Sequence, residues 1–408
     1  MEKLHLLKQY NLVLIRYSEI WLKSQKVKIR MLKILMNNIK NALNRNGIPF
    51  NKYQLSKDSS RVFFFFKNND MGNAIDVLKN VFGIFSISPT LRTSNKINNI
   101  SEKVIEIAKE ILQKGDTFAL RVRRSGTHDY TSIDVARIVG KNIIEELSNY
   151  DLKVNLSNPN KKIFIEIRDD FSYVFSQIIK TPWVGLPIET PKKMFVMDVG
   201  RIYDLIAGFM LMKRGSNIYP ILFNMINNRE NEKIWESNWR ELIAYTPYSN
   251  FTLIKINLLQ ILEKIAPKIN NPELICGICR LTRFKLIGNL KSELEAKRYD
   301  KIRAFTDGLT LTNTSYCDDN VDLESIALSY LFSDYPIFTP LIGFDAEEIN
   351  NLREKISRNL NVFDFCKLKP QNQNYNQAEI LKIFNDLDID PLIDEALKNM
   401  TKISISLA

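Results

Sequence analysis

The sequence is poor in histidine and cysteine and has no long apolar run. Its two histidines, His5 and His128, argue against histidine-based catalytic triads and multi-histidine metal centres in this chain. Four cysteines in 408 residues are too few for a disulfide scaffold, so we expect a reducing, cytoplasmic compartment. No apolar stretch reaches the roughly 18 residues of a membrane span, and the N-terminus lacks a signal-peptide pattern. We therefore expect no membrane association.

Positive charge is in excess and is concentrated in one half of the chain. The net charge is +11, with +12 in residues 1–190 and −1 in residues 191–408. A charge excess confined to one region indicates that this region meets a polyanion while the remainder has another task. A lysine-rich surface that only keeps the protein in solution is the alternative interpretation.

Strand and helix patterns predict three domains. Residues 1–95 form an α+β domain of the ferredoxin-like kind, and residues 96–190 form a second α+β domain. An Asn- and Ser-rich linker is predicted between them at residues 93–100. In residues 191–408 strands alternate with helices, which indicates an α/β domain with a parallel sheet. Such sheets bind ligands beyond the carboxyl ends of their strands.

The strands and helices are predicted from apolar periodicity. In the first domain the strands are residues 12–20, 61–66 and 84–90, and the helices are residues 27–43 and 74–81. In the second domain a helix starts at residue 101 and another spans 132–147, with strands at 118–122, 163–168 and 172–177. In the third domain the strands are residues 194–197, 218–223, 252–256, 304–306 and 336–339, and a helix spans 202–213.

Several short motifs occur in an order that points to one protein family. They are RYSEI with LK (16–20, 22–23), VFGI (81–84), FALRVRRSGTHDYTSIDVARIVG (118–140), EIRD (166–169), GLP (185–187), MKRG (212–215) and PLIG (340–343). This series resembles the tRNA 4-thiouridine synthetases, also called tRNA sulfurtransferases or thiamine biosynthesis sulfur-transfer enzymes, in their archaeal form. The resemblance implies a ferredoxin-like domain, a THUMP RNA-binding domain and a PP-loop ATP pyrophosphatase domain, of the adenine nucleotide alpha hydrolase type. It also implies tRNA as a partner and sulfur transfer to its uridine at position eight after adenylation by ATP.

Basic residues of the second domain are the candidate RNA-binding groups. Arg121, Arg123 and Arg124 lie at one strand end and can direct guanidinium forks toward phosphates. Arg137 and Lys141 are four residues apart on the next predicted helix and so share a face. A solvated basic surface is the alternative.

The nucleotide loop departs from the family pattern. The family's S-G-G-x-D-S turn cradles the pyrophosphate of ATP, but residues 199–204 here read VGRIYD. One glycine remains, and the family's T-G-E turn becomes Thr306-Asp307-Gly308. ATP and Mg²⁺ are therefore expected only if the altered loop still admits a nucleotide. The candidate nucleotide-binding residues are Met197, Asp198, Gly200, Arg201, Asp204, Leu222 and Phe223.

Three cysteines match family positions. Cys276 and Cys279 form a CxxC pair and Cys366 lies far downstream; in archaeal members such cysteines hold an iron–sulfur cluster. Cys317 or a solvent species could supply a fourth ligand. In cluster-free members the late cysteine carries a persulfide, so Cys366 is the candidate catalytic residue. Buried structural thiols or a disulfide are the alternatives.

Two functions follow from these features, and a third, a structural interaction protein that binds no RNA, would leave the basic half of the chain unexplained. The first is a tRNA sulfurtransferase, whose further partners would be a sulfur-donor protein and a second copy of the chain. The second is a non-catalytic THUMP-containing tRNA-binding paralogue that has lost its ATP site.

Overall fold

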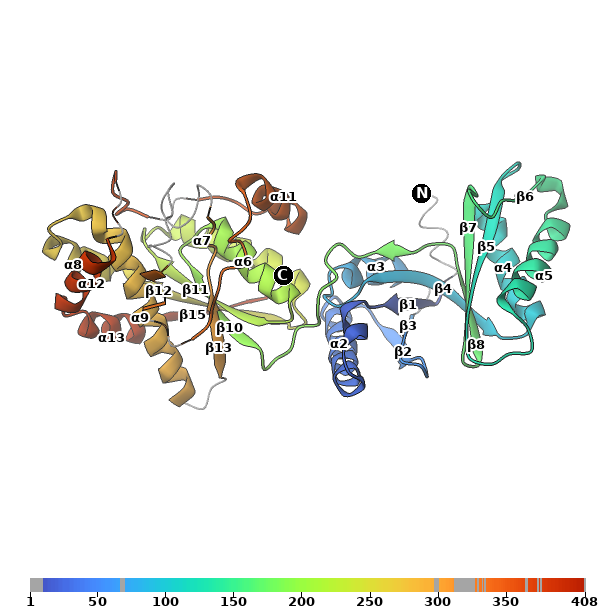
Figure 1. Ribbon diagram of the computed structural model, residues 1–408, viewed down its shortest axis with the longest axis horizontal. Helices are drawn as coiled ribbons and strands as arrows, with labels where there is room; N and C mark the ends of the chain where they lie inside the picture. Colours follow the sequence, from blue (N-terminus) through green and yellow to red (C-terminus); the bar gives the residue numbers. More distant parts are fainter. Residues whose placement is uncertain are drawn as a thin grey trace. The chain divides into compact units, whose positions relative to one another are not determined.

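The computed structural model separates the chain into two units, Met1–Leu186 and Pro187–Ala408 (Figure 1). It describes residues 10–66, 70–296, 301–311, 327–328, 330–331, 333, 335–363, 366–372, 374 and 376–406. We call the two parts the N-terminal and C-terminal units. In the part of the chain that the structure describes, no helix combines the length and apolarity that crossing a bilayer demands.

The N-terminal unit is built on a nine-stranded sheet covered by helices. The strand order is β2-β3-β1-β4-β8-β7-β5-β6, and β9 pairs with β4 off this path. The strands are β1 (Leu12–Arg16), β2 (Phe50–Leu55), β3 (Val62–Phe66), β4 (Ser86–Ser94), β5 (Thr117–Ser125), β6 (Lys153–Val154), β7 (Lys161–Arg168), β8 (Phe171–Phe175) and β9 (Ile179–Lys180). The helices are η1 (Glu19–Leu22), α2 (Gln25–Arg45), α3 (Met71–Lys79), α4 (Ile97–Ile111), α5 (Ser132–Glu146) and η3 (Ser148–Tyr150).

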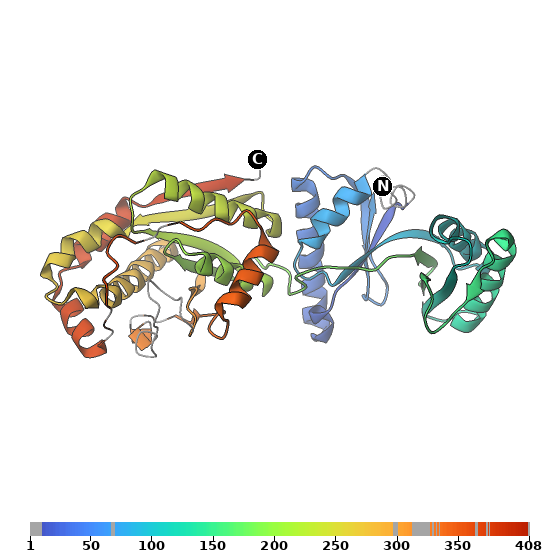
Figure 2. The ribbon, with the colours of Figure 1, turned by 90° about the horizontal axis from the view of Figure 1, so that it is seen from above.

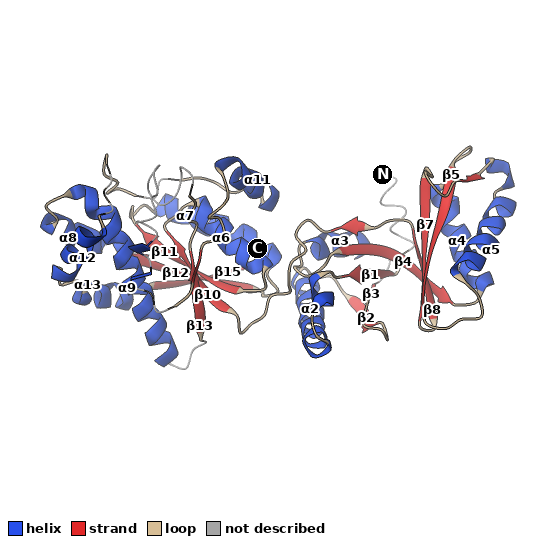
Figure 3. Cartoon of the chain, viewed as in Figure 1, coloured by secondary structure: helices blue, strands red, loops and turns tan. Residues whose placement is uncertain are grey.

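Strand β4 is shared by the two parts of this sheet, which correspond to the first and second predicted α+β domains (Figure 3). Its first half pairs antiparallel with β1, from Ser86 to Thr90, and its second half pairs with β8, from Leu91 to Ser94. The predicted linker at residues 93–100 is therefore wrong, because it is the end of this strand followed by the start of α4 at Ile97. A continuous hydrogen-bonded strand connects the two parts more stiffly than an Asn- and Ser-rich loop would.

The C-terminal unit contains a six-stranded, mainly parallel sheet with helices on both of its faces (Figure 2). The strand order is β14-β13-β10-β11-β12-β15, and only β15 is antiparallel to its neighbour. The strands are β10 (Lys193–Asp198), β11 (Asn217–Asn224), β12 (Asn250–Asn257), β13 (Ile302–Thr306), β14 (Ile337–Phe338) and β15 (Thr401–Ser406). The helices are α6 (Ile202–Lys213), α7 (Arg229–Glu241), η4 (Leu242–Tyr245), α8 (Leu258–Ile265), η5 (Ala266–Lys268), η6 (Pro272–Leu274), α9 (Ile275–Ala296), α11 (Ala346–Ile356), α12 (Gln377–Asp386) and α13 (Asp390–Lys398).

Strand β10 is the topological switch point of this sheet. It pairs in parallel with β11 on one side and with β13 on the other. The chain continues from β10 to β11 and β12 on one side and later returns to add β13 and β14 on the other. Helix α6, which follows β10, lies close to the sheet because Gly208 has no side chain: a Cβ there would come within 3.1 Å of Val196 and Ile218. Ligands of parallel sheets bind at the carboxyl end of such a strand, which places the candidate site at the turn between β10 and α6. The α+β and α/β fold classes predicted from the sequence are confirmed.

Candidate functional site

The turn between β10 and α6 consists of Val199, Gly200 and Arg201. Gly200 has a φ of 92°, in the left-handed region that a residue with a side chain adopts only with strain. The glycine that the altered loop retains is therefore the one that the backbone path requires. The turn delivers the first N–H groups of α6 to the edge of the sheet where an anion would bind.

Asp198, the last residue of β10, is buried and forms a hydrogen bond to this turn. Its Oδ1 accepts the backbone N–H of Gly200 at 2.7 Å. Its Oδ2 accepts the indole N–H groups of Trp235 and Trp239, at 2.6 and 2.7 Å. Asp198 thus links β10 to helix α7 and to the turn, and both of its oxygens are occupied by partners from the protein.

Asp204, in the first turn of α6, is also buried and points back into the turn. Its Oδ2 accepts the backbone N–H of Val199 at 3.1 Å, and its Oδ1 accepts the backbone N–H of Gly308 at 2.8 Å. Gly308 lies just beyond β13, so this carboxylate connects segments that are 104 residues apart in the sequence. Asp204 therefore joins the two strand ends that flank the switch point.

The turn after β13 packs directly on the start of α6. A Cβ on Gly308 would lie 2.4 Å from the carbonyl carbon of Tyr203 and 2.6 Å from the backbone nitrogen of Asp204. Thr306 and Asp307 are fully buried beside it. Glycine is the second residue of the family's T-G-E turn but the third residue of this turn, Gly308. At this position the two backbones are in close contact.

Burial raises the pKa of both Asp198 and Asp204 above that of an exposed aspartate, and the proximity of Asp198 raises the pKa of Asp204 further. The pKa of Asp307 is raised by burial as well, although Arg280 and Arg283 oppose this shift. Three buried carboxyl groups therefore surround the turn, and protons are held here more readily than in solution.

The remaining predicted nucleotide residues line a nearly filled interior. Met197 and Phe223 are fully buried, and Leu222 lines a cavity of about 10 Å³ together with Val199. That volume is about the size needed for one water molecule. The guanidinium of Arg201 lies over the ring of Tyr203, 5.0 Å from its centroid. Met197 lies near the carboxyl end of β10, and Leu222 and Phe223 lie near that of the neighbouring strand β11.

Helix α9 connects this turn to the cysteines. Arg280 of α9 forms an ion pair with Asp307 at 3.5 Å. Cys276 lies one helical turn before Arg280 on the same face of the helix, and Cys279 is adjacent in sequence. The CxxC pair is thus positioned on the helix that borders the turn.

The three predicted cysteines share one apolar cluster. Cys279 is buried, and Cys276 and Cys366 are partly buried against the same cluster; all three are present as thiols. Among the described residues, no group of three or more histidine, cysteine, aspartate or glutamate side chains is gathered as a metal site requires. Cys317, the suggested fourth ligand, lies outside the described residues.

In the N-terminal unit, a cavity of about 560 Å³ brings together part of the predicted RNA-binding set. Arg121 and Arg123 of β5 line it, and the structure adds two basic residues that sequence reasoning missed, Arg16 and Lys162. The walls also carry exposed apolar side chains, among them Ile133. This combination of cations and apolar surface suits phosphates with stacked bases.

Three predicted residues lie outside this cavity. Arg124 donates to the carbonyl of His128 at 3.5 Å, Arg137 pairs with Asp134 at 3.6 Å, and Lys141 pairs with Glu145 at 3.4 Å. All three are exposed. Alternation along β5 separates Arg124 from Arg121 and Arg123, because successive side chains of a strand point to opposite faces.

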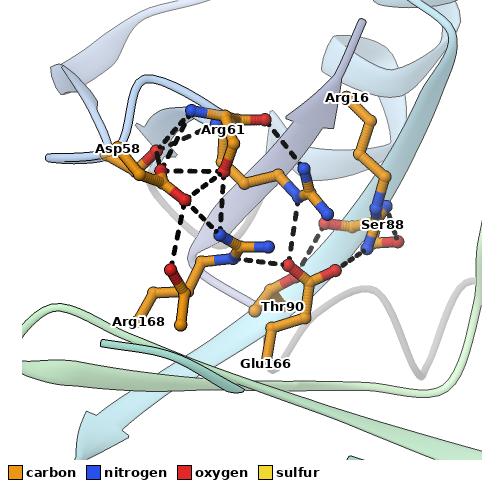
Figure 4. A network of polar contacts seen from close by, with 10 residues as sticks. Arg16, Asp58, Arg61, Ser88, Thr90, Glu166 and Arg168 are labelled. Atoms are coloured by element: carbon orange, nitrogen blue, oxygen red, sulfur yellow. Dashed lines mark hydrogen bonds and ion pairs between the residues drawn. The ribbon is translucent and has the colours of Figure 1, made fainter. Parts of the chain in front are cut away.

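An ion-pair network (Figure 4) includes Arg16 and Glu166, both of which also line the cavity. Glu166 of β7 accepts from Arg16 of β1 at 2.8 Å, from Arg61 at 3.0 Å and from Arg168 at 2.8 Å. Arg168 also pairs with Asp58 at 2.9 Å. Burial raises the pKa of Glu166, but the three guanidinium groups outweigh it and lower the pKa to about 2. The RYSEI and EIRD motifs contain Arg16, Glu166 and Arg168, but neither motif indicates that these side chains pair with one another or with Arg61 and Asp58.

Models of three domain families match the chain in sequence order. The ThiI ferredoxin-like domain matches residues 12–88, the THUMP domain matches residues 94–177, and the thiamine biosynthesis protein (ThiI) model matches residues 194–375. The chain also resembles a solved 4-thiouridine synthetase, crystallised as an RNA complex with bound ATP, with a TM-score of 0.80 and 18% identity over 98% of this chain and 100% of that one. At this identity the likeness establishes the fold.

Curated relatives match over nearly their whole length. A protein of Saccharolobus solfataricus is 32% identical over 93% of this chain and 96% of its own, and one of Saccharolobus islandicus is 30% identical over 97% of this chain and all of its own. One of Methanosarcina mazei is 29% identical over 96% of this chain and 95% of its own. Each is named a probable tRNA sulfurtransferase. This chain belongs to the tRNA sulfurtransferase family.

Proposed function

We propose that this protein is a tRNA sulfurtransferase of the 4-thiouridine type, in which the N-terminal unit binds tRNA and the C-terminal unit delivers sulfur to its uridine at position eight. The observation that carries the proposal is the basic cavity of the N-terminal unit, lined by Arg16, Arg121, Arg123 and Lys162. It occurs in a chain whose relatives are named for this activity. The same comparisons give no support to the non-catalytic alternative.

The cavity fits a nucleic acid better than a small anion. Arg121, Arg123 and Lys162 can contact phosphates, while Phe164 and Ile133 offer apolar surface on which a base can rest. Arg121 is held in place because its Nη2 donates to the carbonyl of Leu156 at 2.6 Å. A guanidinium that is already oriented loses less conformational entropy when RNA binds.

Cys366 is proposed as the residue that carries the sulfur. It is only partly buried, so its thiol borders the apolar cluster while remaining reachable. A sulfur atom held as a persulfide on Cys366 would come from a sulfur-donor protein. This role matches the position of the late cysteine in cluster-free members of the family.

Replacing the 4-oxygen of uridine by sulfur also requires that oxygen to be activated as a leaving group. In the enzymes that the chain resembles, ATP supplies this activation by adenylation. The residues of this chain, as they are arranged, do not fit the phosphates of ATP, because Asp204 and the turn at Gly308 occupy the N-terminus of α6.

An iron–sulfur cluster is a further proposal for the three cysteines. The donor chemistry fits, since Cys276, Cys279 and Cys366 are thiols in one apolar neighbourhood, although they would have to converge as the cluster assembles. Protein purified without oxygen should then contain iron and absorb visible light, and Cys279→Ser should lose both. Iron-free, colourless protein would contradict this proposal and leave the persulfide role of Cys366.

RNA binding tests the main proposal. Replacing Arg121 and Arg123 together by alanine should weaken tRNA binding roughly tenfold and reduce the log–log salt slope by about one unit for each phosphate left without its cation. The matched control removes Lys103 and Lys109 from α4, which takes the same charge from the same unit outside the cavity. Equal effects of the two pairs, measured by filter binding at several salt concentrations, would contradict a role for the cavity.

Two expectations from the sequence remain part of the proposal. A cytoplasmic location follows from the tRNA partner and from the small number of cysteines, which are present as thiols where the structure describes them. A homodimer is proposed on the family resemblance alone, and analytical ultracentrifugation tests it.

A further inference from the structure

The nucleotide turn of this chain is occupied by the chain's own acidic groups. The N–H groups of Val199 and Gly308 donate to Asp204, and the N–H of Gly200 donates to Asp198. Val199 and Gly200 belong to the turn that approaches the pyrophosphate in the family. All three donors are therefore already satisfied by carboxylate oxygens.

A carboxylate is a direct chemical competitor of a phosphate at such a place. Both present oxygen acceptors to the same backbone N–H groups at a helix N-terminus, so only one of them can occupy these donors at a time. Asp204 stands where the family has the last serine of its turn. A serine hydroxyl would leave room for a phosphate, whereas the side chain of Asp204 fills that room and its two oxygens already accept the N–H groups of Val199 and Gly308.

Backbone packing closes the same space. Gly308 lies so near the start of α6 that an added Cβ would be 2.4 Å from the carbonyl carbon of Tyr203. Its N–H is also one of the two donors to Asp204. The hydrogen bond from Gly308 to Asp204 therefore also holds the turn after β13 against the N-terminus of α6.

Ordinary helix capping does not account for this arrangement. In α5 and α11 the acidic residue of the first turn, Asp134 or Glu348, accepts the N–H of the residue that caps its own helix. Asp204 reaches past the capping residue Arg201 to Val199 and to a donor from another strand. Its hydrogen bonds therefore close a site between two strands.

We propose that Asp204 is an internal competitor of nucleotide phosphates, which holds the turn closed by occupying the N–H groups that ATP would use. The inference rests on the proposed function in so far as ATP is the nucleotide concerned. While Asp204 holds these donors, ATP binds weakly. When Asp204 is removed, the donors and the helix N-terminus become available to phosphate.

Calorimetric titration of the full chain with ATP and Mg²⁺ tests the proposal. Asp204→Ser should bind ATP at least tenfold more tightly than the unaltered protein. Asp204→Asn keeps the size of the side chain and should also bind more tightly, because its amide cannot accept both N–H groups without turning a donor toward one of them. Glu348→Ser is the matched control, since it removes a first-turn carboxylate from α11 of the same unit, and should bind like the unaltered protein.

Two results would overturn the inference: micromolar ATP binding by the unaltered protein, or folded Asp204 variants that bind no better than it does. Thermal melting identifies variants that are folded. Binding of tRNA, measured on the same samples, should be unchanged throughout. If the unaltered protein did not bind tRNA, the proposed function would be contradicted. The ATP titrations would still decide the role of Asp204.

Discussion

Gly308 shows how much one residue decides at the altered nucleotide turn. In the sequence it is the displaced glycine of a degraded T-G-E motif, which indicates loss. In the structure it allows two backbones to touch and donates its N–H to Asp204. Glycine at position 308 departs from the family pattern, but in this chain it permits the close contact between the turn after β13 and the start of α6.

Gly308→Ala should destabilise the C-terminal unit. The added Cβ would meet backbone atoms of Tyr203 and Asp204 at 2.4 and 2.6 Å, and these cannot move as a flexible side chain would. We expect a loss of about 3 kcal/mol in the free energy of unfolding. Urea denaturation followed by tryptophan fluorescence measures it, because Trp235 and Trp239 are buried beside the turn.

The control for this substitution is Gly288→Ala. Gly288 lies within α9, and an added Cβ would meet nothing within 4 Å. Alanine should stabilise the helix there by up to about 1 kcal/mol. If both alanine variants changed stability equally, the close contact at Gly308 would be refuted.

Residue patterns predicted that the nucleotide loop is altered but not what replaces its function. Arg201, Tyr203 and Asp204 were visible as departures from S-G-G-x-D-S. The bond from Gly308 to Asp204 was not, because 104 residues separate the two and no local pattern pairs them. Likewise, the sequence placed Glu166 in a motif without showing that three arginines would converge on it.

At the scale of elements, strongly apolar strands and amphipathic helices were predicted well. The run VFFFF is strand β3, fully buried, and the periodic stretch at residues 27–43 lies within α2. Among the missed edge strands are β2 and β15, in which half or more of the residues are exposed and the apolar signal is weak. Their pairing with β3 and β12 comes from tertiary structure, which outweighs local preference.

Strand β4 also shows why an element can mislead. Its end, Thr93 and Ser94, together with Asn95 and Lys96, has the polar composition of a loop. Pairing of Thr93 and Ser94 with β8 nevertheless extends the strand into the THUMP part. As a consequence, the shared strand joins the strands that line the basic cavity into one sheet.

On the scale of the whole molecule, charge and structure divide the chain at nearly the same place. The excess of +12 lies in residues 1–190, and the first structural unit ends at Leu186. The basic cavity lies in this unit, while the altered turn and the cysteines lie in the second. Each unit has its own sheet and core, so each should unfold as a cooperative block.

We therefore expect two transitions in differential scanning calorimetry. Glu166→Gln should lower the melting temperature of the N-terminal unit and reduce its free energy of unfolding by about 3 kcal/mol at neutral pH, because Arg16 and Arg61 lose their carboxylate partner and Arg168 keeps only Asp58. Gly308→Ala should lower the melting temperature of the other transition, that of the C-terminal unit. A single transition that both variants lower would contradict two separate units.

The effect of Glu166→Gln should also depend on pH in a defined direction. The pKa of Glu166 falls from its ordinary 4.5 to about 2 in the folded protein. The folded state therefore gains stability from the ionised carboxylate above about pH 4.5, and loses that gain as the pH falls toward 2. The difference between the variant and the unaltered protein should be full at pH 7 and shrink between pH 5 and pH 3. A difference that stays constant over this range would mean that Glu166 stabilises the sheet by its packing rather than by its charge.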